Sequence, residues 1–65
     1  MIKASKNLVM FIEAQESIEA LAKDLEVTRQ TIYNVKNGSD VSSDMVAKIL
    51  NYTGFDFEKA FEVKE

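Results

Sequence analysis

The sequence predicts an all-α fold, a compact orthogonal bundle of five short helices. Apolar residues recur with a period of about 3.6, and no stretch alternates with period two, which favours helices over strands. Ser, Thr and Asp residues stand just before several apolar stripes, where they can cap helices. The two glycines follow two of these stripes, where helices commonly end. We therefore expect residues 1–65 to form a single domain.

The first two helices are expected over residues 5–15 and 18–25. In the second, apolar residues at 18, 21, 22 and 25 follow the i, i+3, i+4, i+7 spacing of an inner helix face. Ser17 stands at the N-cap of this helix. A tight break follows at Leu25-Glu26-Val27.

Thr28 is a candidate N-cap for a third helix that runs to about Asn37. Val27 before the cap and Ile32 after it have the spacing of a hydrophobic staple. Gly38 can adopt the left-handed conformation that closes the helix.

Ser42 is expected to cap a fourth helix that ends at Gly54. Asp56 is expected to cap a short fifth helix, which carries Phe57, Ala60 and Phe61. These two helices complete the predicted bundle.

The composition argues against catalysis and metal binding. The chain has no Cys and no His, which excludes disulfides, thiol nucleophiles, histidine bases and ordinary zinc, haem or iron–sulfur sites. A chain of 65 residues is also too short to enclose a substrate pocket of ordinary size. We predict that the protein is not an enzyme, with no catalytic residues, no metal, no cofactor and no small-molecule effector.

The sequence predicts no membrane association. Its longest strictly apolar run, Leu8–Ile12, is far too short to span a bilayer. The N-terminus lacks the apolar core and cleavage site of a secretory signal. We expect a cytoplasmic protein.

Residues 17–38 have the spacing of a helix–turn–helix. A small residue at Ala22 lets the following helix approach closely, and Leu25 and Val27 flank a turn of about three residues. Ile32 and Val35 then form the inward face of the next helix. This pattern favours the crossing of about 90–120° found in DNA-reading helix pairs.

The outward face of the third helix has no carboxylate and is rich in side chains that read base edges. Gln and Asn can pair with adenine, Arg with guanine, and Thr or Tyr can contact a phosphate or a thymine methyl. At about 100° per residue, this face consists of Arg29, Gln30, Tyr33, Asn34 and Asn37.

The segment Ser17–Gly38 resembles the helix–turn–helix of the lambda-repressor-like family, which includes phage Cro and repressor proteins and Xre-type regulators. The resemblance is carried by the pattern Leu21-Ala22, Leu25-x-Val27-Thr28, Ile32 and Val35-x-Asn37-Gly38. Residues 49–61 are similar to the closing segment of that family, so the resemblance covers nearly the whole chain.

The resemblance implies a DNA-binding surface and transfers to individual positions. The first motif helix begins at the DNA backbone, where peptide N–H groups favour phosphate. The second motif helix is the recognition helix, and the residues at its start and one turn later face the bases. The residues that follow this helix contact the DNA backbone. The implied DNA-binding residues are Ser17, Ile18, Thr28, Arg29, Gln30, Tyr33, Asn34, Asn37 and Ser39.

The chain departs from the family pattern at two positions. Glu26 stands where the turn usually has Gly, and a left-handed conformation would cost a non-Gly residue roughly 1 kcal/mol. Ile18 stands where many relatives have a Gln that braces a phosphate contact. We therefore expect backbone binding to depend on main-chain amides and Ser17.

The formal net charge of −3 is unusual for a DNA binder. The charge is unevenly distributed, because the only charged residues from Val27 to Ser39 are Arg29 and Lys36, a local charge of +2. Residues 56–65 carry four carboxylates against two Lys. We expect a basic face toward DNA, weak non-specific binding and a shallow dependence of affinity on salt.

A homodimer is expected because small members of the resembled family commonly read two half-sites. We predict a weak homodimer, and one form of this prediction is that the two copies assemble only when bound to DNA. Its surface is either the C-terminal group Phe55, Phe57, Phe61 and Val63 or the apolar run 8–12. In that run five successive apolar residues cannot all face one core, so Val9 or Met10 should point outward.

These observations predict a sequence-specific regulator of transcription that binds a double-stranded DNA operator, Cro-like or repressor-like and from a phage or prophage. The alternative is a protein–protein module on the same scaffold, an antirepressor or antitoxin-like partner that does not read DNA directly. The acidic net charge favours the alternative, and the carboxylate-free face of the third helix argues against it. The starting Met1 favours a complete chain, with a trimmed domain of a longer repressor as the other possibility.

Overall fold

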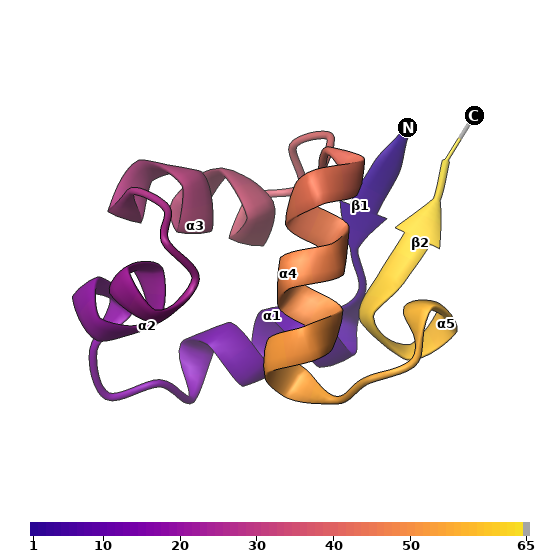
Figure 1. Ribbon diagram of the computed structural model, residues 1–65. Coiled ribbons are helices and arrows are strands. Elements are labelled where there is room, and N and C mark those ends of the chain that lie inside the picture. The colour runs from indigo at the N-terminus through magenta and orange to yellow at the C-terminus, as the bar shows by residue number, and fades with distance from the viewer. Residues whose placement is uncertain (65) are drawn as a thin grey trace.

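The computed structural model describes residues 1–64, which form five helices and two short strands (Figure 1). The mainly helical fold is confirmed. In Figure 1, α2 and α3 form one end of the molecule, and the two strands lie at the other. The elements in chain order are β1 (Ile2–Ala4), α1 (Lys6–Glu13), α2 (Ile18–Asp24), α3 (Arg29–Lys36), α4 (Ser43–Thr53), α5 (Phe57–Ala60) and β2 (Phe61–Val63).

The small antiparallel sheet corrects the expectation of helices alone. Strand β1 pairs with β2 so that Ala4 lies opposite Phe61 and Ile2 opposite Val63. Phe61 therefore belongs to a strand and not to the fifth helix, which ends at Ala60. Each strand has three residues, too few for a period-two pattern to show, and each is stabilised by a partner from the other end of the chain.

The predicted N-caps Ser17, Thr28 and Ser42 are confirmed, and the structure adds Ser5 as the N-cap of α1. Each of these four side chains accepts a hydrogen bond from the backbone N–H three residues later, at 3.1 to 3.3 Å. Asp56 stands at the N-cap of α5, but its side chain makes no capping hydrogen bond, so that part of the prediction is wrong. The backbone carbonyl of Asp56 instead accepts the hydrogen bonds that begin this single turn.

Helix α1 ends at Glu13, two residues before the expected end. The N–H of Gln15 donates to the carbonyl of Ile12, three residues back, at 3.2 Å. Its side-chain amide donates to the carbonyl of Phe11 at 3.1 Å. This tighter last turn satisfies carbonyls that a longer helix would have used and redirects the chain toward α2.

The turn between α2 and α3 contains a residue in the left-handed conformation. Glu26 has φ of 59° and is the only non-glycine residue with positive φ in the described chain. Its N–H donates to the carbonyl of Lys23 at 3.1 Å, and the N–H of Val27 donates to that of Ala22 at 2.9 Å. These two bonds form a Schellman motif, which places Glu26 where Gly is free of strain. A similar motif ends α3, with Gly38 at φ of 91°.

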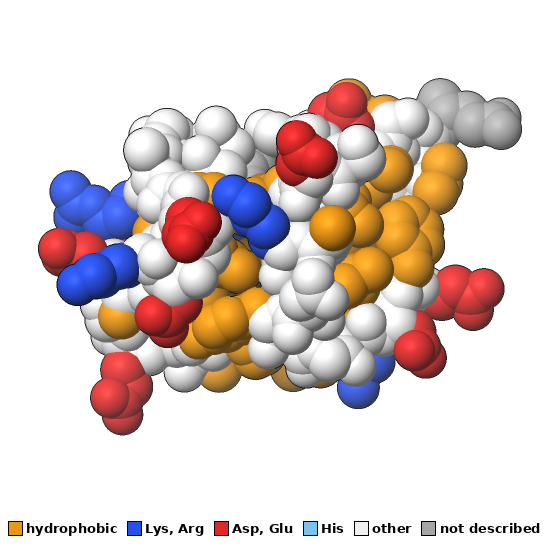
Figure 2. All heavy atoms as spheres, in the orientation of Figure 1, with side chains coloured by type: hydrophobic (Ala, Val, Ile, Leu, Met, Phe, Trp, Pro, Cys, Tyr) orange, Lys and Arg blue, Asp and Glu red, His pale blue; other side chains and the backbone are white. Residues whose placement is uncertain are grey.

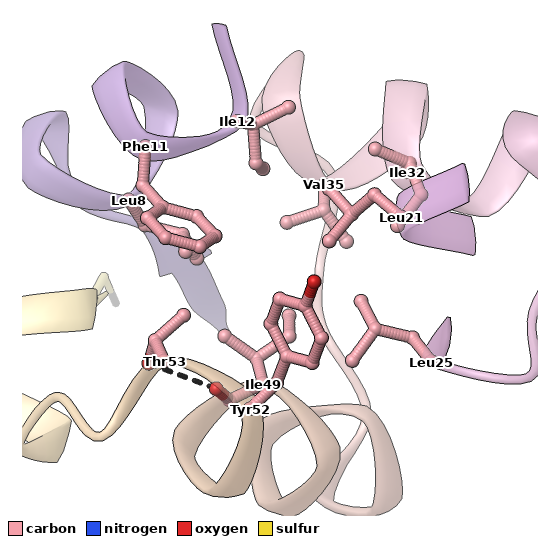
Figure 3. Close-up of a pocket in the computed structure, with 10 residues that line it drawn as sticks. All are labelled: Leu8, Phe11, Ile12, Leu21, Leu25, Ile32, Val35, Ile49, Tyr52 and Thr53. Carbon is pink, nitrogen blue, oxygen red and sulfur yellow. Dashed lines mark hydrogen bonds between the residues drawn. The ribbon is translucent and has the colours of Figure 1, made fainter. Parts of the chain in front are cut away.

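The core draws side chains from all the helices and from β2. Leu8 of α1 and Ile32 of α3 are its largest fully buried side chains, each 1% exposed. Figure 3 shows side chains of α1 to α4 converging on a small apolar cavity of about 10 Å³, at the lower limit for one water molecule. At its rim, the ring of Phe11 meets the rings of Tyr52 and Phe55 edge to face, at centroid distances of 6.3 and 5.7 Å.

The apolar run at residues 8–12 lies within α1 and is divided between core and surface. Leu8 and Ile12 are buried, Val9 is half-buried and Met10 is 57% exposed. The expectation that one of its residues points outward is therefore confirmed for Met10. No helix within residues 1–64 is long and apolar enough to cross a membrane.

Glycine at position 26 should stabilise the protein. Glu26→Gly removes the left-handed penalty and should raise the free energy of unfolding by about 1 kcal/mol. Urea unfolding followed by circular dichroism measures this difference. Glu26→Ala is the matched control, because it removes the charge and keeps the Cβ atom. Equal stabilisation by both variants would show that the carboxylate, and not the backbone conformation, is unfavourable.

Candidate nucleic-acid interface

Helices α2 and α3 form a helix–turn–helix whose inner faces match the sequence pattern. Ala22 is buried in α2, and its small side chain lets α3 approach. Helix α3 buries Ile32 and Val35, half-buries Thr31 and Lys36, and leaves its other side chains exposed. The connecting turn is short because the Schellman motif at Glu26 reverses the chain directly into the Thr28 cap. The second helix of the pair is thus held by its apolar side, with its polar side outward.

The predicted outward face of α3 is exposed along its whole length. Tyr33 is 43% exposed and lies on the surface. The charged residues from Thr28 to Ser39 are Arg29 and Lys36, both basic. The structure therefore brings together on one helix face, without a carboxylate, the predicted residues Arg29, Gln30, Tyr33, Asn34 and Asn37.

Two side-chain amides on this face are joined. The Nε2 of Gln30 donates to the Oδ1 of Asn34 at 3.0 Å, one turn further along α3. An amide nitrogen carries two hydrogens, so Gln30 keeps one N–H donor and its Oε1 acceptor for a ligand. A donor and an acceptor on one planar group are what bidentate pairing with adenine requires. The bond to Asn34 holds that group in place on the helix surface.

Thr28 caps α3 with a hydroxyl that is already engaged. Its Oγ1 accepts from the N–H of Thr31 at 3.2 Å and lies 3.0 Å from the Oγ1 of Thr31. The sequence interpretation did not single out Thr31, although the spacing of two Thr residues three apart at a helix start was available as a signal. The pair places two hydroxyls together at the N-terminus of α3.

Ser17 and Ile18 stand at the start of α2, as predicted, but differ in what they expose. Ile18 is half-buried and packs against the core, so its backbone is the part that can face a ligand. The Ser17 hydroxyl accepts from the N–H of Ala20 at 3.1 Å. Glu16 and Glu19 are exposed on either side and add negative charge near this helix end.

The loop after α3 is tied to the sheet. The N–H of Ser39 donates to the carbonyl of Asn34 at 3.0 Å, and the Ser39 side chain is exposed. The carboxylate of Asp40 accepts from the N–H of Ile2 at 2.8 Å, and the N–H of Val41 donates to the carbonyl of Ile2 at 2.8 Å. These bonds engage one oxygen of the Asp40 carboxylate and tie the loop after α3 to β1.

A side-chain hydrogen bond braces the other end of the motif against α4. The phenol of Tyr52 donates to the carboxylate of Asp24 at 3.2 Å, beside a groove of about 310 Å³. Desolvation raises the pKa of Tyr52 above its ordinary value of 10.0, and the hydrogen bond and charge of Asp24 raise it further. Lys48 and Asn51 of α4 line the groove opposite Glu26.

The end of the molecule formed by α2 and α3 carries both signs of charge. Figure 2 shows Lys and Arg side chains there with Asp and Glu side chains beside them. Arg29 and Lys36 lie on α3, whereas Asp24 lies on α2 and Glu26 in the turn. Lys23 adds a cation to α2, so this end is of mixed charge, and only α3 is free of carboxylates. Within residues 1–64, no acidic cluster is arranged to hold a metal ion.

Comparison with protein families agrees with this geometry. Residues 17–59, about two thirds of the chain, match the family described as helix-turn-helix. The chain therefore belongs to the helix-turn-helix family of the Xre and lambda-repressor type, a family of DNA-binding regulators. The match begins at the Ser17 cap and continues through α4 into α5, so it includes more than the two motif helices. Neither the curated proteins nor the solved structures gave a significant match.

The Tyr52–Asp24 contact should give a tyrosine that ionises at unusually high pH. Because the folded pKa is raised, the contact stabilises the fold below pH 10 and is lost as the pH rises through the folded pKa. Titration of tyrosinate absorbance in a Tyr33→Phe background reports Tyr52 alone. Asp24→Asn should lower the midpoint, and the control Asp44→Asn, on the first turn of α4, should not. Equal midpoints for the two variants would contradict the assignment.

Proposed function

We propose that this protein is a sequence-specific regulator of transcription, Cro-like or repressor-like and from a phage or prophage. It inserts α3 into the major groove of a double-stranded DNA operator and prevents polymerase from using the site. The observation that carries the proposal is the exposed, carboxylate-free face of α3, held outward by the burial of Ile32 and Val35. A helix presented in this way is the part of a helix–turn–helix that enters the groove.

The proposed base contacts lie on the first two turns of α3. Arg29 pairs with guanine, and Gln30 pairs with adenine while Asn34 holds its amide. Tyr33, one turn further along the same face, contacts a phosphate or a thymine methyl. Each role uses donors and acceptors that the side chain still has free.

The proposed backbone contacts surround this face. Thr28 and Ser17 stand at the starts of the two motif helices, where backbone N–H groups favour phosphate. Asn37 and Ser39 stand after the recognition helix and are exposed there. The segment from Thr28 to Ser39 has only two cations, Arg29 and Lys36, to neutralise phosphates. We therefore expect weak non-specific binding and a shallow dependence of affinity on salt.

We propose that the regulator acts as a weak homodimer on a site with two half-sites. Two copies related by a two-fold axis present two recognition helices to successive turns of the major groove. A single copy has few contacts to offer, so the second copy supplies affinity as well as a longer recognised sequence.

Selection from a pool of randomised duplexes at moderate salt tests the proposal. Recovery of a dyad-symmetric motif, with half-site centres about 10 bp apart, is the expected result. A pool that stays random in the presence of folded protein would overturn direct reading of DNA. That outcome would favour a protein–protein module instead, an alternative supported by the net charge of −3 and by the exposed Glu26 in the turn of the motif.

Arg29→Ala should weaken operator binding by about 1–3 kcal/mol if the guanidinium reads guanine. It should also relax the base preference at one position of each half-site. Fluorescence anisotropy with the selected duplex measures the affinity, and a set of single-base variants measures the preference. Lys48→Ala removes a cation that lies outside the motif and is the matched control. A uniform loss across all base variants would assign Arg29 to a phosphate contact.

A further inference from the structure

The pair Asn37-Gly38 follows α3 at the point where the chain turns away toward α4 (Figure 1). Asparagine is a chemically labile residue, because the backbone nitrogen that follows it can attack its side-chain amide. Glycine in the following position has no Cβ atom beside that nitrogen and so hinders the attack least. This is the one asparagine in the sequence that precedes glycine. The others are Asn7, Asn34 and Asn51, which precede Leu, Val and Tyr.

The side chain of Asn37 is exposed and is not held by a hydrogen bond. Within residues 1–64, the hydrogen-bonded side-chain amides are those of Asn7, Gln15, Gln30 and Asn34. Asn34 lies about one turn earlier on the same helix face and differs in both respects. Gln30 binds its amide, and the branched side chain of Val35 shields the nitrogen that follows it. Asn34 is therefore an internal control for Asn37.

The surroundings of Gly38 leave room for a ring to form. A Cβ atom placed on Gly38 would have nothing within 4 Å, so no neighbouring segment obstructs this position. The ψ angle of Asn37 is 1°, which holds the Gly38 nitrogen out of the plane of the ring that would join it to Cγ of Asn37. The peptide unit between the two residues must therefore rotate before the ring can close.

This rotation breaks the two hydrogen bonds that close α3. The N–H of Gly38 donates to the carbonyl of Val35 at 3.2 Å, and the N–H of Ser39 donates to the carbonyl of Asn34 at 3.0 Å. Both bonds lie at a helix end among exposed residues, where local opening costs much less free energy than global unfolding. Opening also releases the Gly38 N–H, which must lose its proton before the nitrogen can attack.

We infer that Asn37 is a site of spontaneous deamidation at the end of the recognition helix. The deprotonated nitrogen of Gly38 attacks Cγ of Asn37 and closes a succinimide ring. The bond between Cγ and Nδ2 breaks, and the amide group leaves as ammonia after taking up a proton from solvent. Water then opens the ring at Cγ to give aspartate, or at the backbone carbonyl carbon to give isoaspartate. Either product has a carboxylate in place of the neutral amide.

The new carboxylate changes the charge of the surface proposed to bind DNA, and this consequence rests on the function proposed above. The segment from Thr28 to Ser39 has Arg29 and Lys36 as its charged residues, so its net charge falls from +2 to +1. The carboxylate repels the phosphates that Asn37 and Ser39 are proposed to contact. It also lies at the C-terminus of α3, where negative charge is unfavourable. Deamidation therefore weakens DNA binding.

The chemical step is tested without DNA. The folded protein is incubated at physiological temperature and mildly alkaline pH, and peptide mass spectrometry with fragmentation follows each asparagine. Asn37 should gain the mass difference between OH and NH₂, at a rate that rises with pH, while Asn7, Asn34 and Asn51 stay unchanged. A synthetic peptide of residues 33–41 is the positive control and should react faster, because no helix closes its turn. An unmodified Asn37 in protein incubated until the peptide has reacted, or an equal rate at Asn34, would overturn the site.

Fluorescence anisotropy with the selected duplex tests the effect on DNA binding. Incubated wild type should bind about three- to tenfold more weakly at low salt, and the difference should narrow as the salt concentration rises. Fresh Asn37→Asp should show a similar loss. Asn37→Gln, whose longer side chain closes a ring much more slowly, is compared with its own unincubated sample and should not change. Circular dichroism checks that each sample is folded.

Two results would overturn the effect on DNA binding: an equal loss in incubated Asn37→Gln, or fresh Asn37→Asp that binds as tightly as wild type. Bound duplex should also slow the reaction at Asn37, because contacts at Asn37 and Ser39 hold the turn closed. Mass spectrometry without DNA decides whether the deamidation site exists. A failed duplex selection would therefore count against the DNA-reading proposal and not against the site.

Discussion

The burial of Ile32 and Val35 is the constraint on which the rest of the structure depends. These two side chains turn one side of α3 toward residues of α1, α2 and α4, and the opposite side must then face solvent. An eight-residue helix has little stability alone, so its orientation comes from this packing rather than from its own helix propensity. The proposed DNA-reading face is thus a consequence of where the core lies.

Both ends of α3 are held by contacts outside the helix. At its start, the left-handed Glu26 allows the turn that delivers Thr28 to its capping position, and the Tyr52–Asp24 bond ties the end of α2 to α4. At its end, Asp40 links the following loop to β1. The sheet therefore does two things: it joins the chain ends, and it anchors the loop that leaves the recognition helix.

Much of the fold and of the candidate site could be read from local signals. The capping residues Ser5, Ser17, Thr28 and Ser42 act within one helical turn, and the apolar spacing that buries Ile32 is a property of one helix, so both were predictable. The sheet was not, because Ala4 and Phe61 are held by hydrogen bonds to a partner far along the chain, and three residues carry no periodic pattern. The joined amides of Gln30 and Asn34 also required side-chain positions.

Local chemistry in the sequence therefore determined the helices, their caps and the polar side of α3, because those features depend on residues within about one turn of each other. The tertiary structure decided that Phe61 lies in a strand and that the edge of β1 is covered by Asp40 and Val41. These features depend on contacts between segments distant in the chain, and composition and spacing do not encode which of two strand edges another segment will cover.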